Sequence, residues 1–206
     1  MEDLRKTNEV VVSGVVNSKY AYSHEIFGEK FYLFDLVVAR MSDEVDVVPV
    51  MISERLTDVT ADNIGSTVMI KGCFRSYNKH EGERSKLILS VFATSIEPME
   101  DYTLNTNFIA LTGNICKPVA YRETPLGREI ADVFVAVNRP YGKSDYIPCI
   151  VWGRAAKFAA TLKVGQKISL EGRIQSRAYE KKHEDGTVEN RVAYEVSTIK
   201  LMLPEE

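Results

Sequence analysis

The sequence contains few cysteines and no long apolar run. Its three Cys residues include no CxxC pair, so they provide no disulfide framework and no zinc-ligand spacing, and they fit a reducing compartment. No apolar stretch approaches the roughly 18 residues of a membrane span, and residues 1–6 are too charged for a signal-peptide core. Gly and Pro make up only 12 and 7 of the 206 residues, which excludes a fibrous or low-complexity chain. We therefore expect a soluble cytoplasmic protein of one or two domains that does not enter a membrane.

Motifs for catalysis and cofactor binding are also missing. The three His residues have no Cys or His neighbour at metal-ligand spacing, so we expect no metal site. No glycine-rich phosphate loop precedes a Lys-Ser or Lys-Thr pair, and no nucleophile-elbow pattern occurs. We predict that the protein is not an enzyme and has no cofactor.

The net charge of −3 provides no overall cationic field, which at first sight argues against a nucleic-acid partner. The two halves differ, however. Residues 1–103 carry 11 Lys and Arg against 17 Asp and Glu, a net charge of −6, whereas residues 104–206 carry 15 against 12, a net charge of +3. A polyanionic partner is therefore expected on the second half.

The chain repeats itself at an offset of 99 residues, which becomes 100 beyond residue 55. Several of the repeated residues are Gly or Pro, which fix backbone geometry and so carry information about the fold. We predict two copies of one domain, 1–100 and 105–206, joined by a short polar segment. The repeated positions include Thr7/Thr106, Asn8/Asn107, Gly14/Gly113, Arg40/Arg139, Asp46/Asp145, Pro49/Pro148, Arg55/Arg154, Gly72/Gly172 and Ser76/Ser176.

Both copies show the same order of expected elements. A strand opens the copy and a polar loop with Gly28 or Gly127 follows; two strands, a short helix and two closing strands complete it. The helix is clearest at 154–163, where apolar residues fall at helical spacing before Gly165. The polar segment 180–190 is expected to form a β-hairpin arm. The expected strands are 10–16, 31–39, 47–52, 68–76 and 87–96, then 108–115, 130–138, 146–152, 167–179 and 191–201.

This order predicts an all-β fold class, with one short helix per domain, in two tandem five-stranded OB-fold barrels. The OB-fold is a Greek-key barrel whose binding face uses strands two and three together with the long loops. An SH3-like barrel or a small sandwich would have similar strands, but a single helix between the third and fourth strands favours the OB-fold.

Several segments of the second copy, taken in order, carry a specific resemblance. They are Asn107 with LTGN (111–114), PVAYRETPLGREIADVFVAVNRPY (118–141), YIPCIVWGRAA (146–156), GQKISLEGRIQSRAYE (165–180) and YEVSTIKLM (194–202). Together they resemble the bacterial single-stranded DNA-binding protein family over almost all of 107–203. The first copy looks like a diverged relative that keeps the framework Gly and Pro positions.

The resemblance implies sequence-independent binding of single-stranded DNA, which protects single strands in replication, recombination or repair. In this family bases stack on aromatic side chains, and Lys and Arg neutralise the phosphates. The stacking positions align with Tyr141, Tyr146, Trp152 and Tyr179, although Tyr146 and Trp152 share a strand face that could instead belong to the core. The candidate phosphate-binding residues are Lys117, Arg122, Arg128, Arg139, Lys143, Arg154, Arg173, Arg177, Lys181 and Lys182, of which Arg154 could be structural.

The first copy lacks these aromatic residues. By the repeat offset, Ser42, Val47 and Ser53 replace Tyr141, Tyr146 and Trp152, and the loop 41–46 is acidic. We expect that this copy has lost the family's groove, because its carboxylates repel phosphates. The aromatic residues around its first long loop are expected to serve an interface or the core; they are Tyr20, Tyr22, Phe27, Phe31 and Tyr32.

The resemblance also bears on partners. Family members usually assemble four OB domains, so a chain with two is expected to form a homodimer of four barrels, although its own halves could pair and stop. They also typically end in a disordered tail with an acidic tip that recruits repair enzymes. Because this sequence ends at 201–206 without one, recruitment by that route is doubtful. The expected location is the bacterial cytoplasm, in association with the nucleoid.

Two alternative functions remain open from the sequence. One is a tandem-OB protein-interaction adaptor of primosome type, with weak or no DNA binding, which the acidic first copy favours. The other is binding of RNA or an oligosaccharide, since OB barrels serve all three kinds of ligand.

Overall fold

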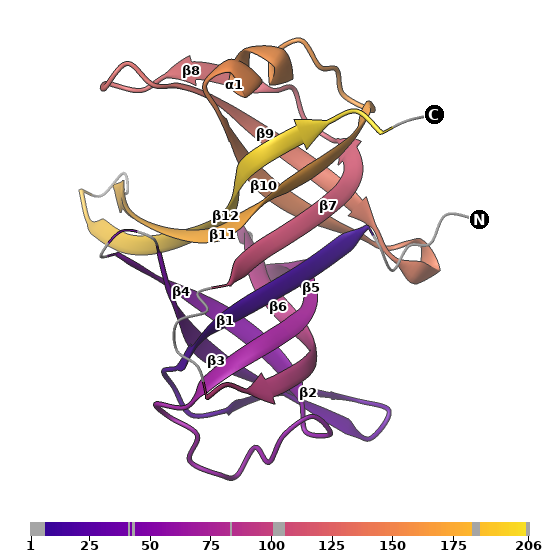
Figure 1. Ribbon diagram of the computed structural model, residues 1–206, viewed down its shortest axis with the longest axis vertical. Coiled ribbons are helices and arrows are strands. Elements are labelled where there is room, and N and C mark those ends of the chain that lie inside the picture. The colour runs from indigo at the N-terminus through magenta and orange to yellow at the C-terminus, as the bar shows by residue number, and fades with distance from the viewer. Residues whose placement is uncertain are drawn as a thin grey trace.

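The computed structural model describes residues 7–40, 42, 44–82, 84–100, 106–182 and 186–204. Twelve strands form one continuous sheet in the order β2-β3-β4-β6-β5-β1-β7-β11-β12-β10-β9-β8. The first copy lies at one end of the long axis and the second copy at the other (Figure 1). The strands of the first copy are β1 (Asn8–Val16), β2 (Ala21–Ile26), β3 (Glu29–Ala39), β4 (Val45–Ser53), β5 (Thr67–Glu81) and β6 (Arg84–Pro98).

The second copy repeats this arrangement and contains two short helices. Its strands are β7 (Asn107–Ile115), β8 (Ala120–Glu123), β9 (Glu129–Asn138), β10 (Ser144–Trp152), β11 (Lys167–Lys182) and β12 (Val188–Met202). The 3-10 helix η2 (Pro140–Gly142) lies between β9 and β10, and α1 (Arg154–Ala159) follows β10.

Each copy closes into a five-stranded barrel. In the first copy β1 pairs with both β3 and β5, and a parallel pairing of β4 with β6 closes the barrel. In the second copy β7 pairs with β9 and β11, and β10 pairs in parallel with β12. The predicted fold class of two tandem OB-fold barrels is confirmed.

The helix expected in the first copy is wrong. Residues 54–66 form turns and bends instead, and among the described residues α1 is the one α-helix. The second copy is rich in Ala here, whereas 55–64 contains Thr, Val, Asp and Asn, which have low helix propensity. The carboxylates of Asp58 and Asp62 accept backbone N–H bonds from Thr60 and Ile64, which holds the turns. Helix α1 is also shorter than the expected 154–163.

The polar loops expected after the first strand of each copy are partly wrong as well. They contain β2 and β8, which form hairpins with β3 and β9. Gly28 and Gly127 lie in these turns with positive φ. Alternation in the short, exposed segments was too weak to indicate a strand, because both faces of β2 and β8 are largely in solvent.

The two barrels join through an antiparallel pairing of β1 with β7. Val10 pairs with Ile109, its own counterpart at the repeat offset, and Asn8 pairs with Leu111 while Val12 pairs with Asn107. The register is therefore the same when the two copies are exchanged, as in a twofold-symmetric interface. Both Val10 and Ile109 are buried, and the buried side chains of the two barrels form one apolar cluster.

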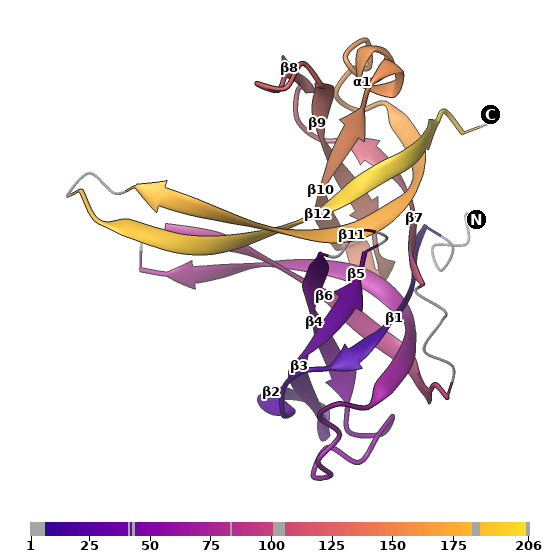
Figure 2. The ribbon, with the colours of Figure 1, turned by 60° about the vertical axis from the view of Figure 1, so that its left-hand side comes forward.

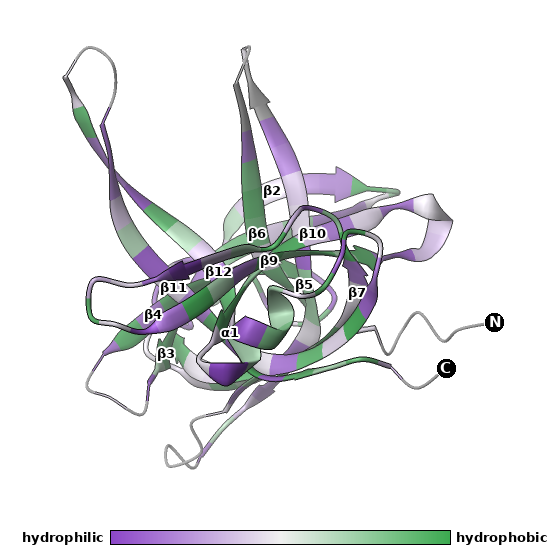
Figure 3. Cartoon of the chain, turned by 90° about the horizontal axis from the view of Figure 1, so that it is seen from above, coloured by the Kyte–Doolittle hydropathy of each residue, from purple (hydrophilic) through white to green (hydrophobic). Residues whose placement is uncertain are grey.

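Strand periodicity explains the core. Hydrophobic and hydrophilic bands alternate along the strands (Figure 3), because successive side chains point to opposite faces. The repeated Gly14 and Gly113 lie where a Cβ would clash with the carbonyl oxygens of Val37 and Ala136, which explains why both copies keep Gly there.

Two long hairpin arms leave the same side of the molecule. The arm of the first copy is formed by β5 and β6, and that of the second copy by β11 and β12 (Figure 2). The second arm is the hairpin expected at 180–190, although residues 183–185 lie outside the described part of the chain, as do 101–105 of the expected linker.

Candidate nucleic-acid interface

The second copy presents a broad outer face, on the side of its sheet that points away from the core. The registers place Phe134 opposite Pro148 and Ile130 opposite Trp152 on β9 and β10, and Ile150 beside Ser197 on β12. On the neighbouring β11 the same face carries every second residue, because paired residues share a face. We call this surface the outer face; its residues are Asp132, Phe134, Tyr146, Pro148, Ile150, Trp152, Arg173, Gln175, Arg177, Tyr179, Glu195 and Ser197.

Three of the four predicted aromatic side chains lie on this face. Tyr146 and Trp152 are exposed by 42% and 39% and Tyr179 by 37%, so none of them is a core residue. The Trp152 Nε1–H donates to Ser197 Oγ at 3.1 Å, which orients the indole. The Arg177 guanidinium lies 5.8 Å from the centre of the Tyr179 ring, a cation–π arrangement.

The fourth aromatic residue, Tyr141, lies in η2 between β9 and β10. Its side chain is 98% exposed, and its backbone is left-handed, with φ 64° and ψ 32°. A non-glycine residue in this region costs on the order of 1–3 kcal/mol, and such strain clusters at ligand sites. The strained turn therefore holds a fully accessible ring beside the outer face.

The predicted cations lie in three places: on or beside the outer face, at its edges, and at the junction between the two copies. On or beside the outer face, Arg122 is paired with Asp132 at 2.9 Å, and the Lys117 ammonium lies 4.4 Å from the centre of the Phe134 ring. Arg173 and Arg177 follow along β11, with Arg177 Nε 3.9 Å from Glu195 Oε1. At the edges lie the loop and helix cations and the arm cations, namely Arg128, Lys143, Arg154, Lys181 and Lys182.

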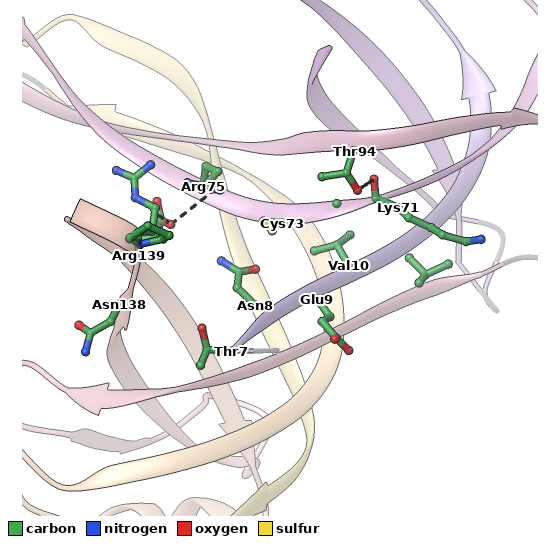
Figure 4. Close-up of a pocket in the computed structure, with 14 residues that line it drawn as sticks. Thr7, Asn8, Glu9, Val10, Lys71, Cys73, Arg75, Thr94, Asn138 and Arg139 are labelled. Atoms are coloured by element: carbon green, nitrogen blue, oxygen red, sulfur yellow. Dashed lines mark hydrogen bonds and ion pairs between the residues drawn. The ribbon is translucent and has the colours of Figure 1, made fainter. Parts of the chain in front are cut away.

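Arg139 belongs to a different environment, the junction between the two copies. Its Nε lies 3.4 Å from Oδ2 of the fully buried Asp145, and Arg75 Nε of the first copy lies 3.9 Å from the same oxygen. The Asp145 Oδ1 accepts a bond from the Ser76 N–H at 2.7 Å. Figure 4 shows Arg75 and Arg139 together at one end of a pocket of about 520 Å³ that both copies line. Arg139 thus pairs within its own copy with the carboxylate that Arg75 and Ser76 of the first copy contact across the junction.

The repeat-related junction is built around Asp46. Its carboxylate accepts two bonds from Arg40, at 2.8 and 2.7 Å, and two from the Ser176 N–H and Oγ–H of the second copy, at 2.6 and 3.0 Å. Asp46 is fully buried, so it does not contribute an exposed charge to the acidic loop 41–46; Met41 and Asp43 lie outside the described residues.

The two buried carboxylates titrate in opposite directions. Burial alone would raise the pKa of Asp46, but the hydrogen bonds from Arg40 and Ser176 outweigh it and hold the pKa below its ordinary value. Burial raises the pKa of Asp145, because its Oδ2 has no hydrogen-bond partner to offset the lost hydration.

The sequence reasoning missed Phe134. It lies on β9 between the buried Val133 and Val135, so its ring points to the outer face. The available signal was the valines at 133, 135 and 137, which share one face of the strand and so place the intervening Phe134 on the other face.

The outer face of the first copy is filled by its own aromatic side chains. The His24 ring stacks on Phe31 at 5.1 Å, Phe31 contacts Phe92 at 5.7 Å, and Arg75 lies 5.4 Å from the centre of the Phe92 ring. Phe31, Met51 and Ser53 are all buried. The first copy therefore offers few open ring faces on this surface.

The outer faces of the two copies border a shared cleft of about 730 Å³ at the base of the arms. Pro49 and Pro148, which are repeat counterparts, both line it, together with Phe134, Tyr179 and Tyr194. Within the described part of the chain, no group of three or more His, Cys, Asp or Glu side chains could hold a metal ion. Among the same residues, no helix is long and apolar enough to cross a membrane.

Comparison with known proteins shows what the second copy is similar to. Residues 106–202 match the model of the single-strand binding protein family. Single-stranded DNA-binding protein 3 of Listeria innocua is 37% identical over 81 residues, which are 36% of this chain and 51% of that protein. Single-stranded DNA-binding protein A of Bacillus subtilis is 36% identical over 81 residues, 36% of this chain and 47% of that protein. The chain thus spans about half the length of the curated relatives it matches.

A solved structure extends the likeness of fold to both copies. The wild-type single-stranded DNA binding protein from Thermus aquaticus superposes with a TM-score of 0.78 and covers 97% of this chain and 93% of its own, at 19% identity. At that identity the likeness shows the fold, with two barrels in one chain. The second copy, residues 106–202, is thus similar in sequence to the single-strand binding protein family, and the likeness of fold extends to both copies.

Proposed function

We propose that the protein binds single-stranded DNA independently of base sequence. It protects the strand during replication, recombination or repair in the bacterial cytoplasm, at the nucleoid. The observation that carries this proposal is the placement of Tyr146, Trp152 and Tyr179 on one outer face, with Tyr141 presented beside it. Each base has a π-face, so stacking on these rings holds any strand, at about 1–3 kcal/mol per base.

The cations around the face provide the second part of the mechanism. Lys117, Arg173, Arg177 and the edge residues Arg128, Lys143, Arg154, Lys181 and Lys182 surround the aromatic residues. Phosphate contacts release counterions, so affinity should fall as salt rises. Arg122 and Arg139 are already held by Asp132 and Asp145, and we expect smaller contributions from them.

The test is a titration with oligo-dT that follows the fluorescence of Trp152, the single Trp of the chain. We expect strong quenching that weakens with salt, because the indole lies on the proposed path of the strand. The Tyr141→Ala variant should lower affinity by about 1–3 kcal/mol, whereas Tyr22→Ala in the first copy should leave it unchanged. Unchanged fluorescence together with no gel shift at low salt would contradict DNA binding.

The adaptor function is supported for the first copy by one observation. Its outer face is filled by the stacked His24, Phe31 and Phe92, so this copy is better suited to a framework or protein contact than to base stacking. If oligo-dT does not bind, the adaptor becomes the favoured function of the whole chain.

We also propose that two chains associate into a homodimer with four barrels. The support is the internal pairing of β1 with β7, which already makes one chain equivalent to a pair of domains. Light scattering should then give twice the chain mass of 23.2 kDa. A strict monomer would mean that pairing stops within the chain.

A further inference from the structure

The outer face of the second copy contains a small hollow that stacking does not use. Its volume is about 240 Å³, and Phe134, Pro148 and Ile150 form its apolar wall. This volume is below the roughly 300–1,000 Å³ of sites for drug-sized ligands, so it suits a single base. The polar side chains that line it include two carboxylates, Asp132 and Glu195.

Glu195 is the unusual member of this hollow. It is only 9% exposed, yet no described group donates a hydrogen bond to its carboxyl, and Arg177 Nε stays 3.9 Å away. Val196, the next residue of β12, points into the core, so Glu195 points to the outer face. Burial raises the pKa of Glu195, and the positive charge of Arg177 offsets only part of this rise.

The chemistry of the hollow selects which part of a nucleic acid can enter it. The lining also contains Lys117, and Asp132 is already paired with Arg122, so Glu195 is the carboxylate left without a hydrogen-bond donor. The apolar wall beside it accepts the flat ring of a base. A carboxylate accepts a hydrogen bond from the N4 amino group of cytosine. Thymine presents the O4 acceptor at the same place, which leaves the carboxylate unpaired and places two acceptors against each other.

We propose that Glu195 accepts a hydrogen bond from the exocyclic amino group of a bound base and gives the second copy a preference for cytosine over thymine. This inference rests on the proposed function, because it assigns a base-reading role to a residue of the same face. Contacts of this kind discriminate between bases at one position, so the binding remains general and is biased in composition.

The experiment compares oligo-dC with oligo-dT of equal length by quenching of Trp152 fluorescence. We measure the ratio of the two affinities in the wild type and in Glu195→Ala, because differences inherent in the two oligonucleotides cancel between the proteins. The ratio of dC to dT affinity should fall about fivefold or more in the variant. Glu180→Ala removes a carboxylate beside Tyr179 on the other face of β11, and should leave the ratio unchanged.

A second variant keeps the test decisive if Glu195→Ala folds poorly. Glu195→Gln retains one acceptor oxygen and adds an N–H donor that the O4 of thymine can accept, so it should shift the ratio toward dT. An unchanged ratio, within twofold, in a folded variant would overturn the inference while oligo-dT binding still supports the proposed function. If the wild type binds neither oligonucleotide at low salt, both fail together.

Discussion

The two copies share one framework but use the same surface in opposite ways. In the second copy Trp152 stands on β10 and the neighbouring β12 offers the small Ser197, so the indole remains open. In the first copy the register places Ser53 at the position of Trp152 and Phe92 at that of Ser197. The aromatic residue has moved to the adjacent strand, where it packs against Phe31 and closes the face. The outer face is thus open where the aromatic residue stands on β10, and filled where the aromatic residue stands on β6, the strand beside β4.

The largest expected effects break this comparison directly. Phe31→Ala should lower the free energy of unfolding by about 3–5 kcal/mol, because it removes a buried ring between His24 and Phe92. Urea unfolding measures this loss, and oligo-dT affinity, measured on the folded variant, should not change.

Trp152→Ala should show the reverse pattern, with affinity lowered by about 1–3 kcal/mol in a gel-shift titration and a smaller loss of stability. Loss of DNA affinity in Phe31→Ala would mean that the filled face also binds the strand.

The two junctions between the copies also differ, in the number of hydrogen bonds that their buried carboxylates accept. Asp46 accepts four hydrogen bonds, from Arg40 and Ser176, whereas Asp145 accepts one, from Ser76. We expect Asp46→Asn to cost about 3 kcal/mol of unfolding free energy, because it removes the buried member of the ion pair with the half-buried Arg40, which keeps only the exposed Glu44 as a carboxylate partner. Asp145→Asn should cost about 1 kcal/mol, since Asn can still accept the Ser76 N–H bond. Equal losses in urea unfolding would show that the two junctions contribute equally.

The pH dependence of stability separates the same two carboxylates. The pKa of Asp46 is lowered on folding, so its contribution is present above the unfolded pKa of about 4 and is lost as pH falls through the folded pKa. The pKa of Asp145 is raised on folding, so its contribution is present below about pH 4 and is lost as pH rises through the folded pKa.

The unfolding midpoint in urea, measured from about pH 3 to pH 6, checks these opposite signs. Asp46→Asn should remove part of the acid-side loss of stability. Asp145→Asn should remove part of the decline above about pH 4. A variant pair that shifts the pH profile in the same direction would contradict the assignment.

The repeat identified the residues of the two junctions as identical positions, but it did not predict which contacts they make. The pairs Arg40/Arg139, Asp46/Asp145 and Ser76/Ser176 were visible as identities, and the structure brings them together across the junction, where each copy completes the other. The contacts themselves could not be predicted, because they join residues 130 positions apart (Asp46 and Ser176) and 69 apart (Ser76 and Asp145) and depend on the pairing of β1 with β7. The sequence alone therefore predicts phosphate binding for Arg139, a side chain that the structure pairs with the buried Asp145.

Local patterns predicted the remainder to different degrees. The barrel strands alternate strongly and were found, whereas β2 and β8 are exposed on both faces and were read as loops. The exposure of Trp152 and Tyr146 could not be decided from spacing alone, since six residues on a strand fix only a shared face. Phe134 does not stand out in the sequence, because every residue of 130–138 except Asp132 and Asn138 is apolar.

The smallest expected effect uses Arg55 and Arg154, which occupy the same repeat position. Arg55 Nη1 lies 3.3 Å from Glu29 Oε2 in the acidic copy, whereas no described carboxylate lies within ion-pair distance of the exposed Arg154, two residues after Trp152. If Arg154 contacts a phosphate, Arg154→Gln should reduce the slope of log affinity against log salt by about 0.7, the value for one contact on a single strand. Arg55→Gln is the matched control and should leave the slope unchanged, because phosphates avoid the carboxylates around it.

Oligo-dT titrations at four or more salt concentrations measure both slopes. Equal slopes for Arg154→Gln and the wild type would assign Arg154 a structural role at the start of α1, and a reduced slope for Arg55→Gln would extend the path of the strand onto the first copy.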